Sequence, residues 1–517
     1  MSTTKLLSHP AVPLLVAALL RLPFLASIPN GFTTDEASTG YDAFSILETG
    51  RDQHGEFLPL FARSFGDYNE SLYRFIAVPF VAVFGLSEFS VRLPAALAGT
   101  ATVGVLYLLV ASASDRRLAW AASLALAINP WHIFFSRTAF RVILFPLLFC
   151  AGLYFCLRER ERSGHLLAGA ACLALALYSY SAARVFVPAF CLGIAVLFWR
   201  ELRPSARRLL WPALLFGAVL AALATFWLTP QGMARADILL TWDLGAITVN
   251  YLSYFDPRFL FFNGDPNPSH SPGDIGQLHL FEMLTVPLGL AALVRERHPL
   301  VRAVWLWLAL YPVSSALTEP TQALRSLIGV PLFAVLSARG LTALWDASDK
   351  PWLKPATVGA LAAALAFFAK TYYLDFPRHA SPLLWRYGMR QAVTRAAASA
   401  YPTVVFSHKL FAPHIFVLFY TGFPPEQYHA QGAEFRQNGW RDPEGAPGFD
   451  RFHFAYIASI ANLTLQSGSL LLVVHAADMA YIDQSSLNWR SIDEIADPMG
   501  RPRIKFIEIS AARQGSP

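Results

Sequence analysis

Two adjacent carboxylates, Asp35 and Glu36, follow the first apolar segment of the chain, residues 10–29. A carboxylate at a membrane boundary is costly unless it has a function, and partial burial there can raise its pKa toward neutrality. Such a group can act as a general base toward a hydroxyl group. The pair also fits a second interpretation, the N-terminal cap of a surface helix, where acidic side chains are favoured.

Four arginines lie in short turns between later apolar segments. They are Arg137, Arg141, Arg184 and Arg325. A guanidinium group grips a phosphate with two parallel hydrogen bonds. For a single arginine at a helix end, extension of the charged head into the membrane interface is the competing interpretation. Because all four share one face with the Asp35 pair in the predicted topology, they indicate a site for an anionic, membrane-embedded substrate.

A long connector, residues 229–277, is rich in aromatic residues, proline and glycine. We expect it to lack regular structure and to cover the site as a lid or substrate clamp. The candidate substrate-binding residues in the loops are Tyr68, Tyr251, Asp265 and His270. Asp265 and His270 could bind a sugar, a metal or nothing, and a solvated loop histidine remains the alternative for His270.

The composition is that of a polytopic α-helical membrane protein. Of 517 residues, 55 % are hydrophobic and 15 % charged, whereas soluble chains average about 25 % charged residues. The net charge of +6 does not indicate nucleic-acid binding, because the basic residues lie mostly in short loops between apolar runs. All four cysteines fall within apolar runs, so we expect neither a disulfide framework nor a zinc site.

The loops set the expected topology. Eleven segments are candidate transmembrane helices: 10–29, 89–111, 118–136, 140–157, 165–182, 184–199, 208–228, 278–294, 299–317, 324–345 and 352–372. Placing the basic loops in the cytoplasm gives a multi-pass protein of the inner or plasma membrane, with a cytoplasmic N-terminus and an extracytoplasmic active site. Residues 72–86 are apolar but short, which favours an interfacial or re-entrant helix over a twelfth span.

The last part of the chain differs in composition. Residues 384–400 have the pattern of an amphipathic helix, and the segments 403–407, 415–421, 469–475 and 504–510 have that of buried strands. The sequence therefore predicts a transmembrane domain, residues 1–372, with outer loops 30–88 and 229–277. A small soluble α/β domain, residues 373–517, follows on the extracytoplasmic side.

Six stretches in order resemble the bacterial C-type glycosyltransferases. This superfamily includes the protein O-mannosyltransferases, the lipid A aminoarabinose transferases and other phospholipid-carrier-dependent enzymes. The stretches are the Asp35-Glu36 pair, GLSEFSVRLPAALAG (85–99), NPWHIFFSRTAFR (129–141), LYSYSAARVFVP (177–188), NYLSYFDPRFLFFNGDPNPSHS (250–271) and SSALTEPTQALRSL (314–327). The resemblance covers most of residues 10–345 and implies the fold of that superfamily.

The resemblance implies transfer of a hexosyl or pentosyl group from a polyprenyl-phosphate donor on the extracytoplasmic face. It assigns the base to Asp35 and a supporting role to Glu36. It gives the donor phosphate to Arg325 first, then to Arg137, Arg141 and Arg184. The acceptor is a lipid, a glycan or a protein, and the chain lacks the inserted lumenal β-domain from which a protein acceptor could be inherited.

Direct displacement of polyprenyl phosphate by an acceptor hydroxyl, with one carboxylate as base, predicts inversion at the anomeric carbon. Arginine side chains can supply the positive charge, so no cofactor is required, although the acidic first loop leaves room for a divalent metal. Membrane lipids are the other expected partners, and nucleic acid is not. The alternative function is a flippase or transporter of lipid-linked sugars without transferase activity. That function would place charges in the middle of the helices rather than at their ends.

Overall fold

The computed structural model describes residues 9–65, 67–158, 164–233, 240–273, 275–379, 381, 385–431, 448–455, 469–481 and 488–510. The chain divides into two compact units. The first comprises Met1–Leu25, Asp67–Tyr73 and Arg92–Leu374, and the second comprises Ala26–Gly66, Arg74–Val91 and Asp375–Pro517. The boundary after Leu374 lies close to the one predicted after residue 372. Most of the predicted outer loop 30–88 groups with the C-terminal residues.

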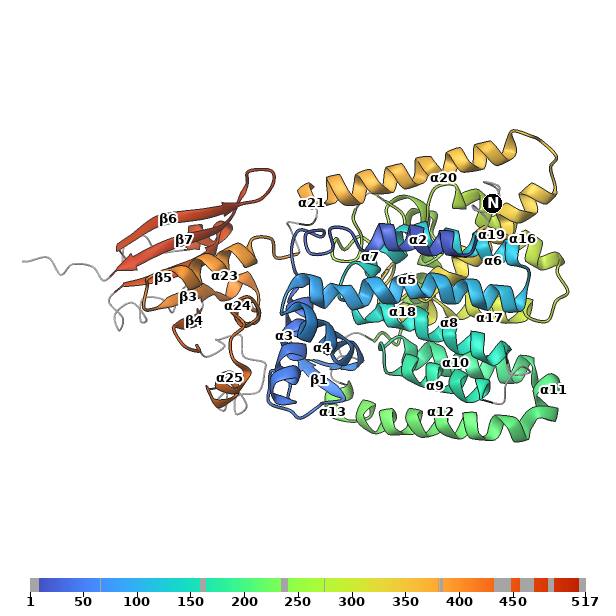
Figure 1. Ribbon diagram of the computed structural model, residues 1–517, viewed down its shortest axis with the longest axis horizontal. Coiled ribbons are helices and arrows are strands. Elements are labelled where there is room, and N and C mark those ends of the chain that lie inside the picture. The colour runs from blue at the N-terminus through green and yellow to red at the C-terminus, as the bar shows by residue number, and fades with distance from the viewer. Residues whose placement is uncertain are drawn as a thin grey trace, which may run out of the picture. The chain divides into compact units, whose positions relative to one another are not determined.

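The first unit is a helical bundle, and Figure 1 shows many of its helices running alongside one another. Its elements are α2 (Ala11–Arg21), β2 (Asp67–Glu70), α5 (Glu88–Ala113), α6 (Arg116–Ile128), α7 (Pro130–Ser136), η1 (Arg141–Ile143), α8 (Leu144–Leu157), α9 (His165–Leu177), α10 (Ala183–Leu197), α11 (Trp199–Leu202), η3 (Arg203–Ser205), α12 (Ala206–Trp227), α13 (Pro230–Met233), α15 (Leu244–Ser253), η4 (Arg258–Phe262), α16 (Glu282–Arg295), α17 (Val301–Leu310), α18 (Val313–Ala316), α19 (Gly329–Asp346), α20 (Leu353–Ala369) and η5 (Lys370–Asp375). Packed pairs include α8 with α9, α9 with α12, α10 with α17, and α16 with α19.

Each of the eleven predicted spans contains a helix. Among the described residues three helices are long and apolar enough to cross a membrane: Glu88–Ala113, Arg207–Trp227 and Leu353–His379. The pair α6 and α7 adds a fourth if it is counted as one span bent by 60°. The chain is thus a membrane protein with at least three apolar spans, and the number eleven stays a prediction.

Two predicted spans differ from straight helices. The segment 10–29 forms a helix only as far as Arg21, and Pro23, which has no backbone N–H to continue the helical hydrogen bonds, follows the cap residue Leu22. The segment 118–136 breaks at Asn129, whose side chain accepts a hydrogen bond from the N–H of His132, while Pro130 begins α7. Arg21 occupies this break and donates to the carbonyl oxygens of Ala127 (2.8 Å) and Leu126 (3.3 Å).

The prediction of an irregular connector over 229–277 is wrong for much of its length. Helix α15 begins where the Asp243 side chain accepts a hydrogen bond from the N–H of Gly245 at 2.9 Å. A π-helix, η4, follows over Arg258–Phe262. Proline and glycine are concentrated after Phe262, so they ended the regular structure there without preventing it upstream. Residues 234–239 and 274 lie outside the described residues.

The second unit is α/β. Its elements are α3 (Thr34–Thr49), β1 (Phe61–Ser64), α4 (Leu72–Phe84), α21 (Phe376–His379), α23 (Met389–Ala398), β3 (Val404–Ser407), η6 (His408–Leu410), α24 (Pro413–Thr421), α25 (Pro425–Gln431), β4 (Phe452–Ala455), β5 (Ser469–His475), η8 (Ala476–Tyr481), β6 (Asn488–Ala496) and β7 (Pro502–Ser510). The sheet order is β4-β3-β5-β7-β6. Strands β4, β3 and β5 are parallel, and β7 and β6 are antiparallel to their neighbours.

Strand β5 lies in the middle of the sheet, and its residues Leu470 to Val474 are buried on both faces. This explains its continuous apolar run. Helix α23 packs on β5 and α24 packs on β3, as Figure 1 shows. The prediction of a strand over 415–421 is wrong, since these residues lie in α24, which begins with Pro413 at its first helical position.

Helix α3 packs against α24 and α25 within the same unit. A Cβ atom at Gly40 would lie 2.5 Å from Cε2 of Phe419, so the glycine permits the close approach of α3 to α24. The Tyr41 hydroxyl donates to the carbonyl oxygen of Phe423 at 2.8 Å. The C-terminal domain therefore anchors the helix whose first turn carries Asp35 and Glu36.

Candidate functional site

The first turn of α3 separates the roles of the two adjacent carboxylates. Thr33 and Glu36 form a capping box: the N–H of Glu36 donates to Thr33 Oγ1 at 3.2 Å, and the N–H of Thr33 donates to Glu36 Oε2 at 2.9 Å. Glu36 is fully buried. The helix-cap interpretation therefore holds for Glu36, which satisfies backbone donors that the helix itself cannot.

Asp35 is exposed in the same turn. Within the described part of the chain, its carboxylate makes no hydrogen bond or ion pair, so no other side chain or backbone group there occupies it. The amide groups at the N-terminus of α3 favour a negative charge at this position. Asp35 thus has the accessibility that a base requires, and Glu36 fixes the turn that carries it.

A buried charge cluster lies further along the same unit. Arg74 Nε donates to Asp42 Oδ2 at 2.6 Å, and the N–H of Gln53 donates to Asp42 Oδ1 at 3.0 Å. Burial raises the pKa of Asp42 despite the opposing effect of Arg74. Burial, with the nearby charge of Asp42, raises the pKa of Asp52 to about 7. These groups tie the middle of α3 to the segment around Asp52.

The first unit brings Arg141 and Arg184 together on one buried carboxylate, Glu70. Arg141 Nε donates to Glu70 Oε2 at 2.9 Å, and Arg184 Nη2 donates to Glu70 Oε1 at 2.7 Å. The Glu70 side chain is 1 % exposed, while Arg141 and Arg184 are 22 % and 21 % exposed. Burial by itself raises the pKa of Glu70, but the two guanidinium groups outweigh it, and the net pKa is lowered.

Aromatic rings hold the two guanidinium groups. Arg141 lies 5.4 Å from the ring centroid of Tyr180, and Arg184 lies 4.8 Å from that of Trp227. Both arrangements permit cation–π attraction. Tyr68, predicted to bind substrate, stacks edge-on against Phe226 next to this group. Two positive charges and one negative charge leave the Arg141–Glu70–Arg184 cluster with a net charge of +1, which suits an anion.

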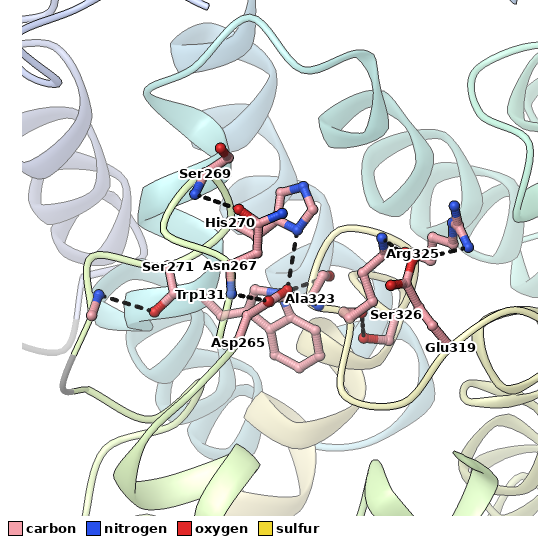
Figure 2. A network of polar contacts seen from close by, with 12 residues as sticks. Trp131, Asp265, Asn267, Ser269, His270, Ser271, Glu319, Ala323, Arg325 and Ser326 are labelled. Carbon is pink, nitrogen blue, oxygen red and sulfur yellow. Dashed lines mark hydrogen bonds and ion pairs between the residues drawn. The ribbon is translucent and has the colours of Figure 1, made fainter. Parts of the chain in front are cut away.

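Asp265 joins the loop after η4 to the turn before α19, as Figure 2 shows. Its Oδ2 accepts a hydrogen bond from the N–H of Ala323 at 2.7 Å, and its Oδ1 accepts one from the N–H of Asn267 at 2.8 Å. Trp131 Nε1 donates to the carbonyl oxygen of Ala323 at 3.0 Å. The N–H and the carbonyl oxygen of Ala323 are thus both hydrogen-bonded. The buried carboxylate of Asp265 therefore stabilises the turn.

His270 Nδ1 lies 3.2 Å from Asp265 Oδ2. The imidazole ring packs beside Phe135 and Phe140, with centroid distances of 6.3 Å to each. The alternative of a solvated loop histidine is therefore excluded, since only 11 % of the His270 side chain is exposed, and a role in substrate binding stays a prediction. No group of three or more histidine, cysteine, aspartate or glutamate side chains among the described residues could hold a metal ion.

Arg325 lies two residues after Ala323, in the turn that Asp265 and Trp131 stabilise. Its side chain is 10 % exposed, and Nη1 lies 3.4 Å from Oε1 of Glu319, whose own side chain is 47 % exposed. Nη1 makes no hydrogen bond within the described structure despite this ion-pair contact. Tyr254 supports the same turn, donating to the carbonyl oxygen of Glu319 (2.8 Å) and accepting from the N–H of Gln322 (3.1 Å).

The remaining predicted residues contact the backbone. Arg137 is fully buried and donates to the carbonyl oxygen of Arg21 at 2.8 Å, so it caps the end of α2. The Tyr251 hydroxyl donates to the carbonyl oxygen of Ala309 at 3.0 Å. Sequence reasoning did not select Glu70 or Arg21. The signal for Glu70 was an acidic residue in DYNESLYR (67–74). The signal for Arg21 was a basic residue at the end of the first apolar run.

Comparisons with known proteins concern both the sequence and the fold. Residues 72–228 match the family model of dolichyl-phosphate-mannose-protein mannosyltransferase. A search of curated proteins finds no sequence match to the chain. The matched segment begins with helix α4, just after Glu70. It contains Arg137, Arg141 and Arg184.

Solved structures of similar fold cover nearly the whole chain. The apo structure of ArnT from Cupriavidus metallidurans is 12 % identical, with a TM-score of 0.65 over 98 % of each chain. The structure of the same protein bound to undecaprenyl phosphate is 13 % identical, with a TM-score of 0.59 over 100 % of each chain.

A third similar structure is the Archaeoglobus fulgidus oligosaccharyltransferase in complex with Zn and sulfate. It is 13 % identical, with a TM-score of 0.50 over 96 % of this chain and 72 % of that one. The likeness to the apo ArnT structure covers 98 % of this chain, so it includes both the helical first unit and the C-terminal sheet of the second. The resemblance inferred from the motifs is therefore confirmed, and the chain has the fold of the C-type glycosyltransferases.

Proposed function

We propose that the chain transfers a sugar from a polyprenyl-phosphate donor to an acceptor on the extracytoplasmic face of the membrane. The observation that carries the proposal is the Arg141–Glu70–Arg184 cluster, in which a buried carboxylate orients two partly exposed guanidinium groups. The structure of similar fold that is bound to undecaprenyl phosphate supports this donor class. The family model, named for a dolichyl-phosphate-mannose-dependent enzyme, supports it as well.

The donor phosphate binds to Arg141 and Arg184, and Arg325 supplies further positive charge. Arginine suits this task because its planar fork can give two parallel hydrogen bonds to phosphate oxygens. Arg184 donates Nη2 to Glu70, and Arg141 donates Nε to Glu70 and Nη2 to Asn69, so both groups are oriented before the substrate arrives. We assign no phosphate contact to Arg137, since it is buried against backbone carbonyl oxygens.

The chemical step is a direct displacement. The acceptor oxygen forms a bond to the anomeric carbon while the bond from that carbon to the phosphate oxygen breaks. The electron pair of the broken bond leaves with the polyprenyl phosphate, and Asp35 takes the proton of the acceptor hydroxyl. Attack from the side opposite the leaving group inverts the anomeric configuration. Arginine charge suffices for the leaving group, so the reaction requires no metal.

The acceptor is a lipid, a glycan or a protein. Enzymes named for protein mannosyl transfer and for oligosaccharyl transfer both appear among the matches, so the shared part is the lipid-linked donor. The helix that carries Asp35 is anchored on the C-terminal domain through Gly40 and Tyr41. That domain therefore supports the helix on which the proposed base, Asp35, lies.

The test is donor turnover by the purified chain in nanodiscs. A panel of polyprenyl-phosphate sugars is presented with membrane extract as acceptor source, and released polyprenyl phosphate is measured by mass spectrometry. Asp35→Asn is expected to reduce turnover by at least about a hundredfold, the lower range for loss of a general base. Arg184→Gln is expected to raise the KM for donor about 10- to 100-fold, because a charge-assisted hydrogen bond is lost.

Arg184→Lys keeps the charge but not the fork, and we expect it to recover only part of the activity. Arg490→Gln is the matched control, since Arg490 is 75 % exposed on β6 and pairs with Glu508. Unchanged turnover in Asp35→Asn would assign the base elsewhere. Transport of lipid-linked sugar across the bilayer without carrier release would favour the flippase function instead.

A further inference from the structure

His270 has a largely buried ring with one open nitrogen atom. Its side chain is 11 % exposed, and Nδ1 lies 3.2 Å from Asp265 Oδ2. The rings of Phe135 and Phe140 pack beside the imidazole. Nε2 has no hydrogen-bond partner in the described part of the chain, yet it is not sealed from solvent as the unpartnered Nε2 of His132 is. The imidazole is therefore fixed in place and offers one accessible nitrogen atom.

Asp265 decides what that nitrogen atom can do. Its carboxylate also accepts the N–H groups of Ala323 at 2.7 Å and Asn267 at 2.8 Å, so its position is fixed from two sides. A carboxylate oxygen only accepts, so the hydrogen of the contact with His270 belongs to Nδ1. Nε2 then carries a lone pair when the ring is neutral and becomes a donor when the ring is protonated. The carboxylate offsets the positive charge of the protonated ring.

Both partners of the pair contact chain segments that carry proposed phosphate-binding arginines. Asp265 stabilises the turn that carries Arg325, and Figure 2 shows His270 in the same network as this turn. Phe140, against which the imidazole packs, directly precedes Arg141 in the chain. The open nitrogen of His270 therefore belongs to the part of the first unit in which the donor phosphate is proposed to bind.

We propose that His270 is a further ligand of the donor phosphate and binds it through Nε2 in the protonated form. This inference rests on the proposed function and adds a residue to its site. The protonated ring gives a phosphate oxygen a charge-assisted hydrogen bond. The neutral ring turns a lone pair toward the same oxygen and repels it. Donor binding is therefore coupled to the uptake of one proton by His270.

The charged groups around the imidazole are few. Asp265 contacts the ring directly. The segment that supplies the two phenylalanine rings carries Arg137, which donates to a backbone carbonyl oxygen, and Arg141, which binds Glu70. The turn beyond Asp265 carries Arg325, which pairs with a glutamate, Glu319. Arginines do not titrate near neutral pH, and exposed carboxylates ordinarily titrate near pH 4. A change in donor affinity near neutral pH would thus report on the imidazole.

The test is binding of undecaprenyl methyl phosphate to the full chain in nanodiscs, measured as a Kd by microscale thermophoresis. This probe is a phosphodiester with one negative charge at every pH used, and it has no sugar, so the identity of the donor sugar does not matter. Binding is compared at about pH 5.5 and about pH 8, on either side of the ordinary imidazole pKa of about 6.5. We expect the Kd of the wild type to be about tenfold higher at the higher pH, the lower value for a charge-assisted hydrogen bond. Asp52→Asn is run beside it, because the pKa of Asp52 is about 7, and should keep this dependence.

His270→Asn separates binding from structure. Its amide N–H takes the place of Nδ1 and keeps the contact with Asp265, but nothing replaces Nε2. We expect the Kd at the lower pH to rise about tenfold and the pH dependence to disappear, while hydrogen exchange at the Ala323 amide stays as in the wild type. His298→Asn is the matched control, since His298 is an exposed loop histidine whose Nδ1 also makes a hydrogen bond, to the N–H of Leu300 at 3.3 Å.

His270→Gln is the second variant, because its longer side chain can bring a neutral N–H toward the position of Nε2. It should recover part of the affinity without the pH dependence, and it decides the question if His270→Asn opens the turn. Wild-type Kd values at both pH values in either folded variant would overturn the inference and leave the proposed function standing. Loss of the pH dependence in His298→Asn or Asp52→Asn would overturn it too. A wild type that does not bind the probe at all would count against the proposed donor class itself.

Discussion

Replacing Asp265 should release the turn that carries Arg325. The carboxylate is 4 % exposed and accepts the N–H of Ala323 at 2.7 Å, so Asp265→Ala leaves a backbone donor without its acceptor. An unsatisfied buried donor costs about 1–3 kcal/mol. This cost corresponds to an increase of roughly 5- to 150-fold in the population of the locally opened turn.

Hydrogen exchange followed by mass spectrometry measures that population. In the peptide covering residues 318–328 of Asp265→Ala, we expect the exchange of the Ala323 amide to be faster by the same factor. Asn267→Ala is the matched control. In the described structure its side chain accepts only the N–H of Ser269, at 2.9 Å, and forms no hydrogen bond to the turn.

Activity gives a second readout of the same variant. If the turn positions Arg325 on the donor phosphate, the KM for donor rises in Asp265→Ala and kcat changes less. Unchanged exchange in the folded variant would refute the proposed pinning of the turn. Faster exchange with an unchanged KM would instead separate the turn from donor binding and remove Arg325 from the proposed site.

Three further predictions concern other contacts. Glu70→Gln should destabilise the protein by about 2–3 kcal/mol, less than the loss for a fully buried pair because both arginines are partly exposed. Thermal melting of Glu70→Gln beside Glu70→Asp, which keeps the charge, measures this destabilisation. Equal melting temperatures of the two variants would contradict the prediction. Because burial raises the pKa of Asp52 to about 7, the folded state holds a proton that the unfolded state releases near pH 4. Stability should therefore fall as pH rises from about 4 to about 7, and melting of Asp52→Asn should lose this dependence. Gly40→Leu should separate α3 from α24 and lower both melting temperature and turnover, whereas Gly217→Ala on α12, which has open space at its Cβ position, should lower neither.

Much of the fold could be predicted because hydrophobic periodicity and length report directly on burial in a membrane. The apolar runs located a helix in every predicted span, and the strands β3, β5 and β7 were predicted from β-branched runs. The same signal failed for α24, since a short helix buried on all sides and a central strand both appear as continuous apolar residues. Three-dimensional context decided that case.

The candidate site was less predictable, since residue type does not report a side chain's partner. Arg137 and Arg141 are four residues apart in one motif. Nevertheless, Arg137 binds backbone carbonyl oxygens in the core, whereas Arg141 shares Glu70 with Arg184. Asp35 and Glu36 likewise divided into an exposed group and a buried cap. Long-range pairing of this kind, with Arg141 standing 71 positions after Glu70, leaves no local pattern.

Under the proposed function, the charge of the Arg141–Glu70–Arg184 cluster affects the rate of transfer as well as donor binding. A lipid-phosphate sugar is a phosphodiester with one negative charge, and the leaving polyprenyl phosphate approaches two because its second pKa is about 6. Positive charge at that position therefore binds the departing group more tightly than the bound donor, which is the condition for acceleration. Without Glu70 the cluster would be more positive, but among the described residues Arg141 would keep only Asn69 and Tyr180 as partners and Arg184 only Trp227, so both guanidinium groups would be less firmly oriented during the step. The buried carboxylate lowers the net charge and fixes the geometry, so we expect Glu70→Gln to reduce kcat even where donor binding is retained.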